Sequence, residues 1–245
     1  MNIHIFDSGE QLDEAAAETI CGFIRAKPGA VLGLATGETP LGIYRKLAEK
    51  FREGLISFRQ VTTFNLDEYV NLPEDHPESY HAYMRRHLFD HIDLPPSRAH
   101  LPCGNAADLA AECQRYDALI EEAGGIDLQM LGIGHNGHIG FNEPGRELAA
   151  GTHVVRLAPE TRRANARFFG SIDEVPERAV TMGVGTILKA RLILLIAKGA
   201  DKADIVRRAL TGPITTECPA SLLQTHPRLV VLLDRAAAKA LGTAG

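Results

Sequence analysis

The chain contains no tryptophan, and only 6% of its 245 residues are aromatic. It has four cysteines, at positions 21, 103, 113 and 218. None of them forms a Cys-x-x-Cys pair, so their spacing matches no zinc framework and predicts reduced thiols in a cytoplasmic protein. Basic residues number 26 against 31 acidic ones, and the formal charge of −5 argues against a nucleic-acid-binding face.

Long apolar segments are also missing. The most apolar run, Leu192–Ala197, is far too short to cross a bilayer and predicts a buried strand, so we expect no membrane partner. The first residues, MNIHIFD, have neither the basic start nor the apolar core of a signal peptide. We find no low-complexity linker, internal repeat or charge block. One domain over residues 1–245 is therefore expected, and a homo-oligomer is compatible with the sequence.

Short apolar runs alternate with amphipathic stretches. Strands are expected at residues 2–6, 30–34, 61–65, 126–132, 152–157, 179–182, 192–197 and 229–233. Helices are expected near residues 8–24, 39–51, 77–92, 107–123, 160–169, 201–210 and 235–241, with Ser8 and Gln11 as a capping box and Thr39 as the N-cap before Pro40. This rhythm predicts an α/β fold with a mainly parallel, doubly wound, Rossmann-like sheet and helices on both faces. We also expect a mobile lid near residues 157–180.

In such sheets ligands bind beyond the carboxyl ends of the strands, so the loops there contain the candidate site. The loop after residues 30–34 contains Thr36, Gly37, Glu38 and Thr39, directly before a helix. Free N–H groups at a helix start favour an anion such as phosphate, although a plain helix cap explains the loop equally well. The Glu38 side chain would have to point away from such an anion.

Asp67 and Glu68 follow the strand at residues 61–65, in what we expect to be a loop. A carboxylate at the end of a strand is placed to act as a general base, which makes Asp67 a candidate. The alternative is a solvated acidic loop without a catalytic role.

The segment LGIGHNGHIGFNEPG, residues 131–145, is the richest in chemistry. Its glycines satisfy G-x-G-x-x-G, which would indicate a dinucleotide site if a helix followed at once. Gly140 and the Pro144-Gly145 pair interrupt any such helix, so Gly137 and its neighbours more plausibly let the backbone approach a smaller ligand. His138 and Glu143 could converge there as a base and its orienting carboxylate.

Two cations, Arg167 and Lys202, lie near the expected ends of helices and could hold a phosphate, although each alone is more typical of a solvated surface. A metal centre is not expected. His135 and His138, and likewise His87 and His91, have suitable spacing, but neither pair has an evident third ligand.

Taken together, these segments resemble the glucosamine-6-phosphate deaminase family. The likeness runs in order through LGLATGETP, FNLDEY, HPESY, GHIGFNEP, ANARFF, GVGT and SLLQTHP, and covers nearly the whole chain. It implies conversion of glucosamine 6-phosphate and water to fructose 6-phosphate and ammonia, with no redox cofactor and no metal.

The resemblance also implies residue roles. Asp67 would move a proton from C2 to C1, and His138, supported by Glu143, would open the sugar ring. Thr36 to Thr39, Arg167 and Lys202 would hold the phosphate.

The chain departs from some members of the family at two places. Asn136 stands where they have an aspartate, and we include it in the site as an uncharged hydrogen-bonding residue. Residues 151–155 contain no Arg or Lys. We therefore expect no activation by N-acetylglucosamine 6-phosphate, and a rate increase on adding it at sub-saturating substrate would contradict this.

Two alternatives are kept. A 6-phosphogluconolactonase would hydrolyse a lactone on a similar architecture, but the FNEP and DEY segments resemble the deaminase. A sugar-phosphate sensor without turnover would usually have lost a catalytic carboxylate or gained a basic DNA-binding segment. Asp67, His138 and Glu143 are all present.

Overall fold

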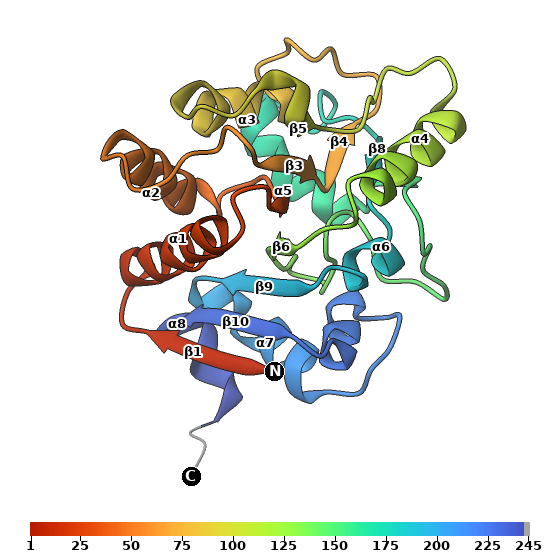
Figure 1. Cartoon of the computed structure of the whole chain (residues 1–245). Helices are drawn as coiled ribbons and strands as arrows, with labels where there is room; N and C mark the ends of the chain where they lie inside the picture. Colours follow the sequence, from red (N-terminus) through yellow and green to blue (C-terminus); the bar gives the residue numbers. More distant parts are fainter. Residues whose placement is uncertain (243–245) are drawn as a thin grey trace.

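A seven-stranded parallel sheet forms the centre of the molecule in the computed structural model, which describes residues 1–242 (Figure 1). Its spatial order is β1-β10-β9-β6-β2-β3-β5. The strands are β1 (Asn2–Phe6), β2 (Val31–Leu34), β3 (Thr62–Asn65), β5 (Ala99–His100), β6 (Leu128–Leu131), β9 (Leu192–Ala197) and β10 (Leu229–Asp234). All six neighbouring pairs are parallel. The predicted α/β class is therefore confirmed.

Strands β2, β6 and β9 contribute most to the core, because nearly all their side chains are apolar and both faces of the sheet are covered. Every residue of β2 and β6 is buried, as are five of the six in β9. Such continuous apolar runs are typical of parallel strands covered by helices. The edge strand β1 differs, since four of its five residues are exposed.

Helices surround this sheet (Figure 1). They are α1 (Gly9–Ala26), α2 (Leu41–Arg52), α3 (Tyr80–His87), α4 (Leu109–Glu122), α5 (Pro159–Phe169), α6 (Val184–Leu188), α7 (Ala203–Thr211) and α8 (Arg235–Ala238). Short 3-10 helices are η1 (Phe89–His91), η2 (Pro96–Arg98), η3 (Ala200–Lys202), η4 (Pro219–Thr225) and η5 (Lys239–Leu241). Ser8 caps α1 as predicted, because its side chain accepts from Gln11 N at 3.2 Å.

Two predicted helix starts are wrong. The N-cap position of α2 is Pro40, with no side-chain cap, so Thr39 does not cap the helix. The helix predicted over residues 77–92 is shorter, because Ser79 accepts from Ala82 N and starts α3 at Tyr80. Beyond His87 the chain continues only as the short turn η1.

Residues 67–69 were expected in a loop but form a strand. β4 (Asp67–Tyr69) pairs with β8 (Arg178–Thr181), which pairs with β7 (His153–Arg156), in a separate antiparallel sheet. The chain changes sheets at Leu66, whose N–H still bonds Leu34 O while its carbonyl accepts from Met182 N at 2.7 Å. Asp67 is therefore held by backbone pairing on a strand rather than by a flexible loop.

Within residues 1–242, none of the helices combines the length and apolarity that a membrane crossing requires.

Candidate functional site

The strand order brings the predicted loops to one edge of the sheet. β9, β6, β2 and β3 are consecutive neighbours, and all are parallel. Their carboxyl ends lead into the segments that contain Lys202 on η3, His138 and Thr36 in loops, and Asp67 on β4. Parallel strands present these ends at the same edge, where ligands of open α/β sheets bind.

Asp67 lies at this edge as a buried carboxyl group with 6% of its surface exposed. Its Oδ2 faces Gly140, where an added Cβ would lie 3.6 Å away, and its backbone pairs with Thr181 on β8. Burial, followed by the negative charge of Glu68, raises the pKa of Asp67 to about 8. A carboxyl group with a pKa near neutrality can both take and return a proton, as a general base must.

Glu143 is the best-satisfied carboxylate of the site. Oε1 accepts from the Thr161 hydroxyl at 2.6 Å and from Ala158 N at 3.3 Å, and Oε2 accepts from Asn136 Nδ2 at 2.7 Å. His138 Nδ1 lies 3.4 Å from the same Oε2, at ion-pair distance. Burial would raise the pKa of Glu143, but its contacts with His138, Thr161 and Asn136 outweigh burial and lower it to about 2.

The glycines of this loop make room for side chains that pack closely against its backbone. A Cβ on Gly134 would lie 2.3 Å from the His138 ring, and one on Gly137, where φ is +91°, would lie 2.7 Å from Cys218 Sγ. Asn136 Oδ1 accepts from His138 N at 3.1 Å, which ties the imidazole residue to the Asn136–Glu143 pair. No helix occurs between β6 and α5, so the geometry of a dinucleotide site is not present in this described segment.

The loop after β2 surrounds the start of α2. Gly37 has a φ of +92°, and its carbonyl accepts from the Tyr83 hydroxyl at 2.5 Å. Thr36 lies close to the Tyr80 hydroxyl, and the Thr39 hydroxyl lies near Gly132, at the end of β6. The loop therefore touches both α3 and the loop that contains His138.

Two predicted cations contact the loops at this edge, Arg167 the loop after β2 and Lys202 the loop after β6. Arg167, in the last turn of α5, has its Nη2 3.0 Å from a Glu38 carboxylate oxygen, and its guanidinium lies 4.8 Å from the Phe168 ring centroid. Lys202 donates to Ile133 O at 3.0 Å, and burial lowers the pKa of its ammonium group. The Glu38 side chain thus pairs with a cation that could serve an anion.

Several residues of this region escaped the sequence-based prediction. Tyr80 contacts Thr36 and stacks on Phe141, and Thr161 binds Glu143 from α5. Thr161 lies in the first turn of a helix that begins with Pro159. That position indicates a side chain near the free N–H groups of the helix start, but it does not indicate that Glu143 is its hydrogen-bond partner. A cavity of about 200 Å³ extends between α3 and α5, lined by Gly37, Glu38, Tyr80, Tyr83, Asn165 and Phe168 among others.

Among residues 1–242, no group of three or more His, Cys, Asp or Glu side chains is arranged to hold a metal ion. His135 pairs instead with Asp201, at 2.7 Å.

Known proteins share both this sequence and this fold. The family model for glucosamine-6-phosphate isomerases/6-phosphogluconolactonase matches residues 7–231. A glucosamine-6-phosphate deaminase from Geobacillus sp. (strain WCH70) is 54% identical over 226 residues, which cover 92% of this chain and 90% of that protein. The solved structure of a monomeric glucosamine-6-phosphate deaminase has a TM-score of 0.96 at 50% identity, covering 98% of this chain and 100% of its own. A 6-phosphogluconolactonase from Leishmania guyanensis, at 23% identity and a TM-score of 0.79 over 99% of both chains, shares the fold alone. The chain belongs to the glucosamine-6-phosphate isomerase/6-phosphogluconolactonase family.

Proposed function

We propose that this enzyme is a glucosamine-6-phosphate deaminase, which converts glucosamine 6-phosphate and water to fructose 6-phosphate and ammonia. The observation that carries the proposal is that Asp67 and the loop of the His138–Glu143 pair lie at one sheet edge, near Arg167 of α5 and Lys202 of η3. Relatives that are more than half identical, such as the Geobacillus protein, have the same name. The lactonases are similar only at a level that shows the fold, so the hydrolase alternative is not favoured.

Ring opening is assigned to His138. The step moves a proton from the anomeric hydroxyl to the ring oxygen, which suits an imidazole. Glu143 stays ionised at working pH, because its pKa is about 2, and it lies 3.4 Å from the ring nitrogen that would otherwise lack a partner. Asn136 supports the arrangement through Glu143 and the His138 backbone, without adding a second negative charge.

Isomerisation is assigned to Asp67. Its carboxylate would take the C2 proton of the open chain and return it to C1, which leaves a C=N bond at C2. Water would then add to C2 and ammonia would leave, so that the water oxygen becomes the ketose carbonyl. The pKa of about 8 fits a group that alternates between its two protonation states at neutral pH. Thr36, Gly37, Thr39, Gly137, Arg167 and Lys202 would hold the phosphate and so set the register of the sugar.

The remaining assignments are proposals of the same kind. Residues 1–245 would act as one unit, with residues 157–180 as a lid, since α5 contributes both Arg167 and Thr161. A sugar phosphate is a charged metabolite, which favours a cytoplasmic location. The related solved structure is described as a monomer, and association of this chain with copies of itself stays a prediction.

Ammonia release from a panel of sugar phosphates tests the function. We expect release from glucosamine 6-phosphate and, in a parallel assay, no hydrolysis of 6-phosphogluconolactone. Hydrolysis of the lactone without ammonia release would reverse the assignment, and binding of the amino sugar without either product would indicate a sensor.

A further inference from the structure

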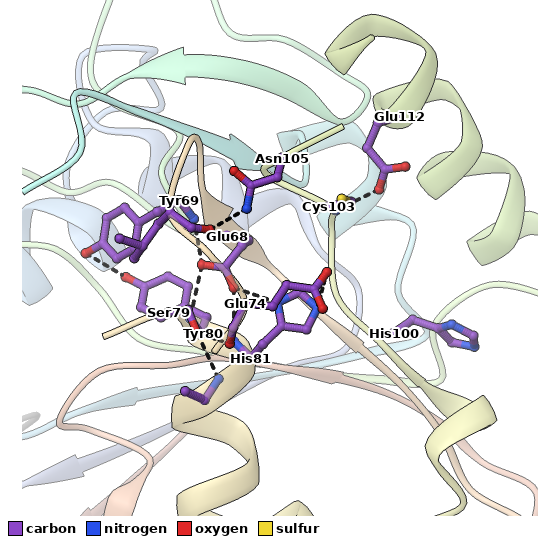
Figure 2. Close-up of polar contacts among 12 residues, drawn as sticks. Glu68, Tyr69, Glu74, Ser79, Tyr80, His81, His100, Cys103, Asn105 and Glu112 are labelled. Atoms are coloured by element: carbon purple, nitrogen blue, oxygen red, sulfur yellow. Dashed lines mark hydrogen bonds and ion pairs between the residues drawn. The ribbon is translucent and has the colours of Figure 1, made fainter. Parts of the chain in front are cut away.

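Glu68 is a buried carboxylate that the reaction above does not use. Only 1% of its surface is exposed. Its Oε1 accepts from Tyr69 N at 2.8 Å and Tyr80 N at 3.0 Å, while Oε2 accepts from His81 N at 3.0 Å and lies 2.7 Å from His81 Nδ1 (Figure 2). A buried charge is stable only when its oxygens are satisfied in this way. The arrangement is therefore specific to a carboxylate.

Two of these donors are the first N–H groups of α3, which starts at Tyr80. Ser79 caps the helix locally by accepting from Ala82 N, so Glu68 satisfies the two N–H groups that the local cap leaves free. A negative charge at this end also complements the helix dipole. Glu68 thereby fixes the start of α3 against β4, the strand of Asp67.

The residue placed by this contact, Tyr80, touches three parts of the site. Its ring lies 4.8 Å from that of Tyr69 and stacks on Phe141 at 6.2 Å, and Phe141 belongs to the loop between His138 and Glu143. Its hydroxyl bonds that of Tyr69 at 3.3 Å and is within reach of Thr36. A shift at the start of α3 would therefore reach the base, the imidazole loop and the anion loop together.

We propose that Glu68 is a positioning residue of the enzyme, whose charged carboxylate holds the start of α3 and thereby aligns Tyr80 and Asp67 for proton transfer. The inference rests on the proposed deaminase function. It goes beyond it by assigning a role to the second carboxylate of the Asp67-Glu68 pair.

The charge of Glu68 also acts on Asp67. Successive side chains of a strand point to opposite faces, so Glu68 faces α3 while Asp67 faces the Gly140 loop. Glu68 is the charged neighbour that, after burial, raises the pKa of Asp67. The other titratable groups around the pair are Tyr69 of β4, Tyr80 and His81 of α3, Tyr116 of α4, and Glu74, whose Oε1 lies 3.8 Å from His81 Nε2. Removing the Glu68 charge should let Asp67 ionise at lower pH.

The competing explanation is that Glu68 only stabilises the fold as a helix cap. Glu112 offers a matched control, because it is a buried glutamate that accepts a backbone bond from Cys103 N at 2.8 Å and pairs with Arg115, and it lies apart from the Glu68 cluster (Figure 2). The variants to compare are Glu68→Gln, which removes the charge, Glu68→Asp, which keeps the charge but shortens its reach, and Glu112→Gln. Thermal unfolding, the pH profiles of kcat and KM, and ¹³C NMR titration of Asp67 with labelled aspartate would be measured for each.

We expect Glu68→Gln to lower kcat about tenfold to a hundredfold, because small misplacements of reacting groups are costly. KM should rise by a smaller factor, because the anion loop is affected only through Tyr80. The acidic limb of its kcat profile and the Asp67 titration should both move down by roughly half a pH unit or more. Glu68→Asp should lower kcat without moving the limb, and Glu112→Gln should change stability alone. A Glu68→Gln enzyme with normal kcat and an unmoved Asp67 titration would reduce Glu68 to a helix cap.

If Glu68→Gln does not fold, Glu68→Asp still tests the proposal. A normal kcat in Glu68→Asp would contradict it, because the shorter side chain should misplace the start of α3. The NMR titration needs no turnover, so it judges Glu68 even if wild-type enzyme releases no ammonia, a result that would instead overturn the proposed function.

Discussion

Asp67 is a buried carboxyl group and Glu143 a half-buried one at the same sheet edge, and their surroundings shift their pKa values in opposite directions. Asp67 is enclosed and has a like charge beside it, so its pKa rises to about 8. Glu143 is also desolvated, yet His138, Thr161 and Asn136 favour its ionised form and lower its pKa to about 2. A pair of titratable groups pushed apart in this way indicates a division of labour, in which one group exchanges protons and the other stays charged.

The two residues also differ in the backbone elements that hold them. Asp67 lies on β4 of the small antiparallel sheet, and Glu143 lies in a loop that leaves the large parallel sheet. Asp67 is therefore held by the backbone pairing of β4 with β8. The Glu143 carboxylate is held instead by side chains from its own loop and from α5. A movement of α5 would disturb Glu143 before it disturbed Asp67.

The largest expected effect tests the proposed role of Asp67 in proton transfer. Asp67→Asn keeps the shape but removes the base, so kcat should fall by about 10²–10⁴-fold while KM stays close to that of the wild type. The control is Asp127→Asn, a buried aspartate at the opposite edge of the sheet that pairs with Lys27 and Arg191. Near-normal turnover in Asp67→Asn would assign the proton transfer to another group.

The next effect concerns how the free energy of unfolding depends on pH. Asp67 and Glu143 should change it in opposite directions. The folded pKa of Asp67 exceeds its usual 3.8, so the unfolded chain releases this proton first, and stability is lost between about pH 4 and pH 8. Glu143 shows the reverse, because its folded pKa lies below 4.5 and its contribution is present above that pH and lost as the pH falls through about 2. Urea unfolding at pH 8.5 should therefore find Asp67→Asn more stable and Glu143→Gln less stable than wild type, each on the order of a few kcal/mol. If both variants were more stable than the wild type, or both less stable, the opposite pKa shifts of Asp67 and Glu143 would be contradicted.

A smaller effect is expected at the anion loop. Arg167→Ala would remove the proposed charge-assisted contact to the phosphate, worth roughly 1.5–3 kcal/mol, so KM should rise about tenfold to a hundredfold with a smaller change in kcat. Arg163→Ala on the same helix is the control, because Arg163 is exposed and pairs with Glu160 at 3.1 Å. An unchanged KM in Arg167→Ala would place Arg167 outside the site.

Much of this arrangement could be predicted from the chain because its signals are local. Buried runs such as Leu192–Ala197 and the Ser8 cap depend on neighbouring residues. The carboxyl-end rule then selects loops that the strand order brings to one edge of the sheet. The local pattern predicts a loop for the segment from Asp67 to Tyr69, since three residues with two carboxylates show no strand pattern of their own. Its strand exists through pairing with residues 179–181, which a local pattern cannot show.

The contacts that the sequence does not predict also join residues that are distant along the chain. Glu68 reaches the start of α3, and Thr161 reaches Glu143 from α5. Thr39 was expected to cap α2 because it precedes Pro40, but the helix begins one residue later and the Thr39 hydroxyl lies near Gly132 instead. The roles of these side chains depend on which loops meet, and that follows from the strand order rather than from spacing along the chain.

The smallest effect is expected at Glu38, whose carboxylate was predicted to avoid a bound anion and which pairs with Arg167. A phosphate has to compete with this carboxylate for the guanidinium, and both side chains are more than half exposed, so the pair is worth at most about 1 kcal/mol. Glu38→Gln should therefore lower KM by at most about fivefold without changing kcat, and added salt should reduce the difference because it screens the pair. Glu160→Gln, which frees Arg163 on the same helix, provides the control. A KM that rises in Glu38→Gln would mean that the carboxylate supports the anion loop or contacts the sugar, and the competition between Glu38 and phosphate would have to be abandoned.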